Sequence, residues 1–318
     1  MKAFLRHSLA GAFILMAAAL ATSTSASADE LKTVRIANMK YGNLVLLQSS
    51  RLLDTRLKPL GFKSSWTIFP SGPPALEALN VGAIDIAMGG ESTPIFAQAA
   101  GADLVYIGNE PASPRGEAIL VPRGSALRSV KDLAGKRIAL TKGSNVHYLL
   151  VRALEDSGVS YAEVKPVFLA PADARAAFQS GAVDAWVIWD PLRAAAEIDI
   201  GARTLRDGVG LVSNHQFFFS TRRFAQDNPA VVREILAAIK EVDAEMTSDI
   251  DKAARSLAPA MGVPYEVLKP SLDRQAWDVQ PLSGSVVAQQ QRLADTFHGL
   301  GLIPKKIDVQ SRIWNPTH

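Results

Sequence analysis

The sequence contains no cysteine, which excludes disulfide bonds, thiolate metal sites, iron–sulfur clusters, a cysteine nucleophile and a lipid-modified N-terminal cysteine. Histidine is scarce as well, and none of the five histidines pair at the spacing of metal ligands, so we expect no metal site. Neither sign of charge dominates, because 34 lysines and arginines stand against 31 aspartates and glutamates and form no basic run. We therefore expect no binding to nucleic acid.

The rest of the composition is that of a globular protein. Of the 318 residues, 48% are hydrophobic and 20% are charged, which excludes a disordered, collagen-like or coiled-coil chain. This length suits one large or two medium domains. Lys142-Gly143-Ser144 is not a phosphate-binding loop, which has its glycine before its lysine, and Gly-x-Ser-x-Gly is absent. We expect neither a cofactor nor an enzyme.

Residues 1–28 have the pattern of a secretory signal peptide. A positive start with Lys2 and Arg6 precedes an apolar stretch from Leu9 to Ala21, and the segment ends in the small-x-small pattern Ala26-Ser27-Ala28. The apolar stretch is short for a membrane span, although an N-terminal anchor helix is the alternative. We expect export, cleavage near Ala28 and a soluble mature protein.

An internal repeat is the most informative feature of the sequence. Residues 35–43 read RIANMKYGN and residues 137–145 read RIALTKGSN, so Arg, Ile, Ala, Lys and Asn recur at an offset of 102. A second set of matches, at an offset of 99, relates residues 68–85 to residues 167–184. Two linked matches at nearly the same offset indicate a duplicated unit.

Each copy has the pattern of strand, helix, strand, helix, strand, which predicts an α/β fold of two lobes, each a mainly parallel sheet flanked by helices. The runs 117–122 and 215–220 are candidates for extended crossings between the lobes. We predict that lobe 1 comprises residues 29–120, that lobe 2 comprises residues 121–213, and that residues 214–318 return to lobe 1 with mostly helical structure.

Ligands of open parallel sheets bind at the carboxyl ends of the strands, so two such lobes predict a ligand cleft between them. The turns at these ends are rich in Gly, Ser, Asn and Thr and lead into helix starts, whose N–H groups favour an anion. We therefore predict a small anion held mostly by uncharged donors, with aromatic side chains against its organic part. The predicted ligand-binding residues are Lys40, Tyr41, Gly90, Glu91, Ser92, Thr93, Ser144, Asn145, Trp189 and Asp190.

Several of these residues have a second interpretation. Ser144 and Asn145 can simply cap the helix that follows them, and Asp190 can cap the next one. Glu91 either orients a basic neighbour, holds an amine of the ligand or forms a structural ion pair. His147 is expected on the surface or at the rim of the cleft, because it lies opposite the apolar stripe of its helix.

Five segments, spread over most of the chain, form a recognisable pattern. They are, in order, residues 40–42 (KYG), 94–106 (PIFAQAAGADLVY), 142–150 (KGSNVHYLL), 171–178 (PADARAAF) and 184–191 (DAWVIWDP). These segments resemble the aliphatic-sulfonate-binding proteins of bacterial ABC importers. The sequence departs from that pattern at residues 37–39, 92–93 and 192–193, all in turns predicted to line the cleft.

This resemblance implies the periplasmic binding protein-like II fold and a periplasmic solute receptor. Such a receptor captures a small organic anion, here an alkanesulfonate, by closure of its lobes and delivers it to an inner-membrane ABC permease. We expect it to act as a monomer. The alternatives are a receptor of the same fold for taurine, nitrate or a pyrimidine or amine compound, and an exported enzyme acting on a small anion.

Overall fold

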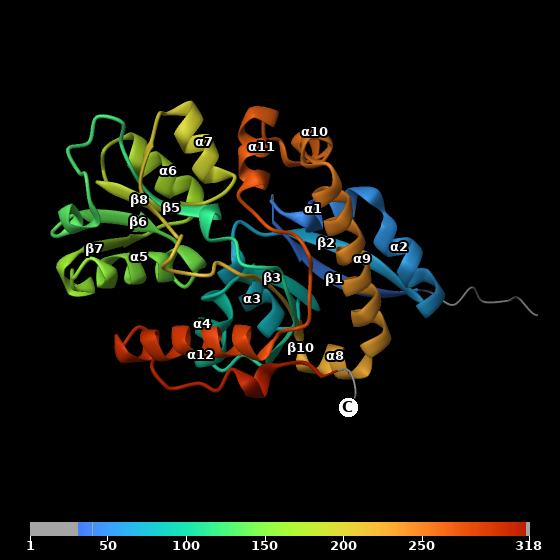
Figure 1. Ribbon diagram of the computed structural model, residues 1–318. Helices are drawn as coiled ribbons and strands as arrows, with labels where there is room; N and C mark the ends of the chain where they lie inside the picture. The colour runs from blue at the N-terminus through green and yellow to red at the C-terminus, as the bar shows by residue number, and fades with distance from the viewer. Residues whose placement is uncertain (1–30, 40, 316–318) are drawn as a thin grey trace, which may run out of the picture. The chain divides into compact units, whose positions relative to one another are not determined.

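The structure, a computed structural model, describes residues 31–39 and 41–315. The predicted signal peptide and Lys40 therefore lie outside the described residues. Two five-stranded mixed sheets, each flanked by helices, form two lobes within residues 31–315 (Figure 1). This arrangement confirms the predicted α/β fold class. Among the described residues, no helix has both the length and the apolar character that crossing a bilayer requires.

The first lobe combines residues from both ends of the described chain, and its sheet has the strand order β2-β1-β3-β10-β4. Its strands are β1 (Lys32–Asn38), β2 (Phe62–Ile68), β3 (Ile86–Gly90), β4 (Leu104–Asn109) and β10 (Gln216–Thr221). Its helices are α1 (Asn43–Ser50), α2 (Leu52–Leu57), α3 (Gly72–Asn80), α4 (Thr93–Ala99), α8 (Arg222–Asp227), α9 (Pro229–Ser248), α10 (Ile250–Met261), α11 (Tyr265–Asp273) and α12 (Gly284–Gly299).

The second lobe is continuous in sequence, and its sheet has the order β7-β6-β8-β5-β9. The predicted boundary at residue 121 falls inside β5, which belongs to this second sheet as a whole. Its elements are β5 (Glu117–Val121), β6 (Arg137–Leu140), α5 (Asn145–Asp156), β7 (Lys165–Phe168), α6 (Pro171–Gln179), β8 (Ala185–Trp189), α7 (Leu192–Asp199) and β9 (Arg203–Asp207). Short 3-10 turns are η1 (Lys58–Leu60), η2 (Pro114–Gly116), η3 (Val130–Leu133), η4 (Tyr161–Glu163) and η5 (Gln310–Arg312).

Both sheets have the same topology, as the repeat predicts. β1 lies parallel between β2 and β3, and β6 lies parallel between β7 and β8. In each sheet a single strand, β10 or β5, runs antiparallel to both of its neighbours. Each of these reversed strands is the first one formed after the chain crosses from the other sheet, so the two crossings meet the sheets at equivalent places.

Equivalent contacts in the two copies of the repeat hold the starts of the strands. The backbone N–H of Arg35 donates to Asp85 Oδ2 at 2.8 Å, and that of Arg137 donates to Asp184 Oδ2 at 2.8 Å. Each arginine side chain also donates to the carbonyl of the glycine three residues before its aspartate. These contacts join β1 to β3 and β6 to β8 at the ends of the strands remote from the predicted cleft.

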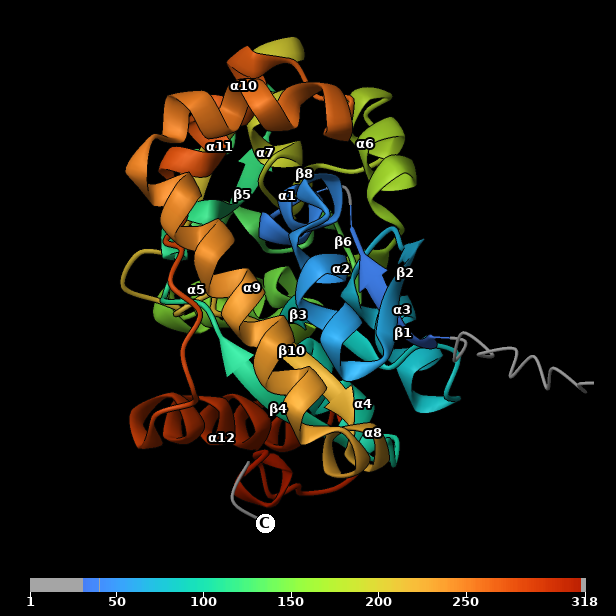
Figure 2. The ribbon, with the colours of Figure 1, turned by 90° about the vertical axis from the view of Figure 1, so that its right-hand side faces the viewer.

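Packing of amphipathic helices closes the core of each lobe. The apolar stripe of α5 is fully buried, and α9 lies along α1 and α2 with its apolar face against them (Figure 2). The sequence predicted one helix from Asn43 to Leu57, but the helix is interrupted at Arg51, which has a left-handed backbone (φ 55°). Ser49 and Ser50 precede this break and donate to carbonyls of their own helix, a contact that competes with helix continuation.

Candidate ligand site

A small cavity lies at the carboxyl ends of β3 and β8 and has about 30 Å³ of space for water-sized molecules. Both lobes contribute to its wall. The lining residues are Tyr41, Gly90, Glu110, Ser113, Gly116, Asn145, Trp189, Asp190, Asn214, Gln216, Gln275 and Ala276. Five of the ten predicted ligand residues are among them. Four others, Glu91, Ser92, Thr93 and Ser144, are buried next to lining residues, and Lys40 is outside the described chain.

Gly90 and Asn145 bring the two lobes into close contact at the cavity. β3 extends to Gly90, beyond the predicted strand end at Met88, and α5 begins at Asn145. A Cβ atom on Gly90 would lie 2.8 Å from the Cβ of Asn145, closer than such atoms approach. Glycine at position 90 is therefore needed for this packing.

The repeat-matched Asn43 and Asn145 each hold a buried glutamate next to the cavity. Asn43 Nδ2 donates to Glu110 Oε1 at 2.7 Å, and Asn145 Nδ2 donates to Glu117 Oε2 at 2.5 Å. Each amide also has a second protein acceptor, so the amide N–H groups of Asn145 face protein oxygens. These second acceptors are Asp243 Oδ1 at 2.7 Å and Asn214 Oδ1 at 2.9 Å.

Two pairs of buried carboxyl groups result. Burial raises the pKa of Glu110 well above its usual value, the charge of Asp243 raises it further, and the pKa of Asp243 is raised as well. Burial also raises the pKa of Glu91 to about 8 against two backbone N–H donors, those of Asn214 and His215. The pKa of Glu117 is raised by burial and by the charge of Glu91. These raised pKa values favour a protonated carboxyl group in each pair.

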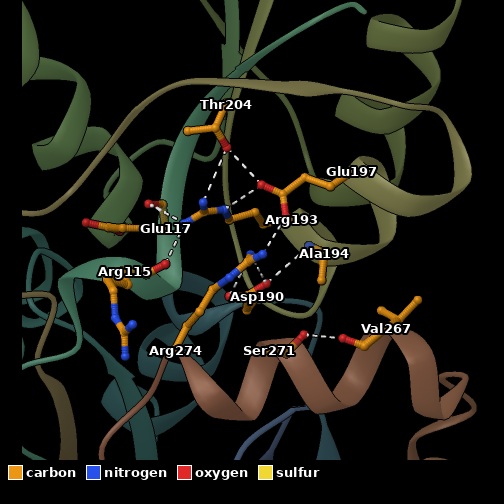
Figure 3. Close-up of polar contacts among 10 residues, drawn as sticks. All are labelled: Arg115, Glu117, Asp190, Arg193, Ala194, Glu197, Thr204, Val267, Ser271 and Arg274. Carbon is orange, nitrogen blue, oxygen red and sulfur yellow. Dashed lines mark hydrogen bonds and ion pairs between the residues drawn. The ribbon is translucent and has the colours of Figure 1, made fainter.

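Asp190 belongs to a different cluster, in which two arginines balance two carboxyl groups (Figure 3). Arg274, which follows α11, places Nη1 3.3 Å from Asp190 Oδ1 and Nη2 2.6 Å from Glu197 Oε2. Arg193 Nε lies 3.0 Å from Glu197 Oε1. Asp190 Oδ1 also accepts the backbone N–H of Ala194 in the first turn of α7, but α7 begins at Leu192 with Pro191 as its N-cap residue, one position later than the capping interpretation predicts. Burial raises the pKa of Asp190 to about 7 despite the two arginines.

The remaining predicted residues either contact other protein groups or are buried without a hydrogen-bond partner. Ser144 Oγ donates to the carbonyl of Thr141 at 2.8 Å and does not cap α5. Ser92 Oγ and Glu91 Oε1 are buried without a hydrogen-bond partner. Within the described residues Glu91 forms no ion pair, so the structural salt bridge considered for it is not found, while Arg152 and Arg292 line a groove with it. Thr93 packs beneath Gly72 and Gly89, at the start of α4.

The prediction for His147 was wrong. The side chain is fully buried among Phe96, Phe168 and Phe297, and its Nε2 lies 2.8 Å from the Tyr161 hydroxyl. Burial lowers its pKa to about 4. The apolar stripe of α5 is the face that packs within the second lobe. The opposite face, which carries His147, packs against α4 and α12 of the first lobe and is buried as well.

Helix starts at the cavity lack side-chain caps. α1, α4 and α5 begin near the cavity, and none has a capping side-chain hydrogen bond. Helices elsewhere, such as α3, α6 and α9, also lack a side-chain cap, whereas α10 and α12 are capped by Asp249 and Ser283, so a missing cap alone does not mark the cavity. The first N–H groups of an uncapped helix need another acceptor, and a bound anion supplies one. Among the described residues, no group of three or more His, Asp or Glu side chains could hold a metal ion.

Sequence reasoning did not identify the residues that the crossings bring to the cavity. Glu110, Ser113 and Gly116 lie on the first crossing, Asn214 and Gln216 on the second, and Gln275 follows α11. The available signal was topological, because a segment that joins two lobes must pass the space between them. Their side-chain directions depend on tertiary packing.

Comparison with known proteins places the chain in a family. The sequence profile of the family described as NMT1/THI5 like matches residues 68–253. A protein of Escherichia coli (strain K12) named as an aliphatic sulfonates-binding protein is 44% identical over 308 residues, 96% of each chain. The chain belongs to the aliphatic-sulfonate-binding protein family. The resemblance noted in the sequence is thereby confirmed.

Solved structures of this family have the same fold. The alkanesulfonate-binding protein from Xanthomonas axonopodis pv. citri, bound to MOPS, superimposes with a TM-score of 0.85 and 44% identity over 90% of this chain and 99% of that one. A desulfurization enzyme superimposes with a TM-score of 0.65 at 16% identity over 89% and 96% of the two chains, which shows a shared fold alone. The chain is therefore homologous to the solute-binding proteins of sulfonate importers.

Proposed function

We propose that the mature protein is a periplasmic receptor that captures an aliphatic sulfonate in the cavity between its lobes and delivers it to an inner-membrane ABC permease. The observation that carries this proposal is the 44% identity to an aliphatic sulfonates-binding protein over nearly the full length of both chains. Residues 1–28 would direct export and be removed near Ala28.

The cavity supports capture of a small anion by uncharged donors. Uncapped starts of α1 and α5 supply backbone N–H groups, and Trp189 has a buried indole N–H without a partner. A sulfonate has three oxygen acceptors and no proton to donate, so it fits such a set of donors. Lys40 would add a positive charge next to Tyr41.

Closure of the lobes would complete the site. Gly90 and Asn145 belong to different lobes and leave no room for a side chain between them. Opening that contact would admit the ligand, and reclosure would remove it from water, the hinge motion known for this class of receptor. The closed form would be the one that the permease recognises.

Isothermal titration calorimetry of the purified mature protein with a series of alkanesulfonates, taurine, nitrate and sulfate tests this function. We expect heat of binding with sulfonates and none with nitrate. Binding of nitrate, or of another solute, without binding of any sulfonate would overturn the substrate. Recovery of chemically unchanged ligand after long incubation separates a receptor from an enzyme, and a converted ligand would overturn the receptor role.

A further inference from the structure

The wall of the cavity is acidic. Two of its lining residues, Glu110 and Asp190, carry carboxyl groups, and no lysine or arginine is among the lining residues that the structure describes. A carboxylate repels a sulfonate, and the repulsion is strong where water is excluded. A ligand that also carries a positive charge is therefore a better electrostatic match for this wall than one that is only anionic.

The two carboxyl groups differ in whether a cation balances their negative charge. Asp190 contacts Arg274, which also binds Glu197, and Arg193 completes this neutral cluster (Figure 3). Glu110 forms no ion pair within the described part of the chain. It accepts N–H donors from the side chain of Asn43 and the backbone of Asp278, at 2.7 and 2.9 Å.

The surroundings of Glu110 add further carboxyl groups, although each buried pair favours keeping one proton. Asp243 shares the same Asn43 amide, and Glu91 with Glu117 forms a second buried pair behind Asn145. Of the basic groups near these pairs, Lys240 lies 2.9 Å from Asp278 and Arg193 binds Glu197, whereas Arg152 and Arg292 line a separate groove with Glu91. The lining of the cavity itself thus has two carboxyl groups and, among the described residues, no lysine or arginine.

Aromatic rings and an unpartnered donor complete the wall. The rings of Tyr41 and Trp189 lie with centroids 6.3 Å apart at 56°, and both line the cavity. Ring faces attract a cationic nitrogen. Trp189 is 6% exposed and its indole N–H has no partner, so the same wall offers a donor for an anionic oxygen. These features independently indicate a ligand with both charges.

We propose that the preferred ligand is a zwitterion, a sulfonate that also carries a protonated amine. The ammonium group lies against Glu110 and the faces of Tyr41 and Trp189. The sulfonate accepts hydrogen bonds from the Trp189 indole and from backbone N–H groups at the helix starts. This inference rests on the proposed function and narrows its substrate class.

Matched ligands test the inference on the full mature protein by calorimetry. Taurine and propane-1-sulfonate have nearly the same size but differ in the ammonium group, as do MOPS and 3-cyclohexylpropane-1-sulfonate. We expect each amine-bearing ligand to bind about tenfold more tightly than its partner, as for one charge-assisted contact. As pH rises through the pKa of the MOPS nitrogen, the affinity ratio of MOPS to taurine should fall.

Substitutions test whether Glu110 is the carboxyl group that holds the ammonium group of the ligand. Glu110→Gln should bring each pair of ligands close to equal affinity, whereas the exposed control Glu266→Gln should keep the wild-type preference. Thermal melting checks that each variant folds, and the pH dependence of the MOPS ratio needs no variant. Retention of the full preference in a folded Glu110→Gln protein would contradict the assignment of that residue.

The outcomes separate this inference from the proposed function. Tight binding of propane-1-sulfonate at the affinity of taurine would overturn the zwitterion and leave the sulfonate receptor intact. Binding of no sulfonate at all would overturn both. Propylamine serves as the control for the amine alone, and its binding at the affinity of taurine would also overturn both, because the sulfonate would then contribute nothing.

Discussion

Arg274 Nη2 lies 2.6 Å from Glu197 Oε2, and the same guanidinium contacts Asp190. Arg274 follows α11, whose side chains pack in the core of the first lobe, whereas Asp190 and Glu197 belong to the second. Asp190 is fully buried and Arg274 is largely so. One arginine therefore links the lobes through two carboxylates at the edge of the cavity.

Replacement of this arginine should destabilise the protein. Arg274→Gln leaves Asp190 buried without its main charge partner, so we expect the free energy of unfolding to fall by about 2 kcal/mol, less than for a fully buried pair because Arg274 keeps some exposure. Chemical denaturation measures it. Lys240→Gln removes only an exposed, solvent-screened pair and should cost much less. Equal losses in the two variants would contradict the interlobe role of Arg274.

A side chain at position 90 should weaken ligand capture. The Cβ of Gly90→Ala would collide with Asn145 and keep the lobes from their closest approach. We expect about a tenfold loss of affinity in calorimetry, roughly 1.4 kcal/mol. Gly124→Ala is the matched control, because a Cβ there meets no atom within 4 Å. Wild-type affinity in Gly90→Ala would show that capture does not need this contact.

Substitutions of the two tryptophans of β8 should affect ligand binding and stability separately. Trp189 lines the cavity, whereas Trp186 is completely buried in the core of the second lobe. Trp189→Phe removes the indole N–H, and the loss of one hydrogen bond should weaken binding by about threefold to tenfold. Trp186→Phe should lower stability through lost packing and leave affinity unchanged. The reverse pattern would place the ligand elsewhere.

Stability should depend on pH through Glu91. Its pKa is raised from 4.5 to about 8, so the folded protein binds a proton between these values that the unfolded chain has released. The Glu91 contribution to the unfolding free energy therefore falls as pH rises from about 4.5 to 8, by at most about 1.4 kcal/mol per pH unit. Glu91→Gln should remove this component of the slope.

His147 changes the stability in the opposite direction with pH, and it therefore determines the pH range in which Glu91 should be measured. Its pKa is lowered to about 4, so its contribution to stability is lost as pH falls from about 6.5 toward 4. Comparison of wild type with Glu91→Gln between pH 6.5 and 8 is therefore free of His147. Parallel stability curves over that range would contradict a buried, protonated Glu91.

The repeat made most of the fold predictable. Local patterns of strands and helices recur in both copies, so Arg137–Leu140 and the helix after Asn145 were located closely, and the shared sheet topology followed. The sequence indicated residues 117–122 and 215–220 only as extended crossings between the lobes, and not as the reversed strands β5 and β10 of the two sheets. Their pairing depends on contacts far apart in the chain.

The site was less predictable because its residues have competing partners. Asn145 reaches the cavity as expected, yet its amide donates to Glu117, a residue on the crossing. Helix periodicity describes one packed face, so His147 on the other face of α5 was placed at the surface although it is buried. Glu110 carries no local motif and becomes notable only once Asn43 and Asp243 are found beside it.

A crystal structure of the mature protein with MOPS, the ligand of the Xanthomonas relative, tests the central claim most directly. We predict the sulfonate in the cavity between β3 and β8, within hydrogen-bond distance of Trp189 Nε1, and the morpholine nitrogen next to Glu110. Ligand density in the polar groove lined by Arg152 and Arg292, with this cavity free of ligand, would contradict it.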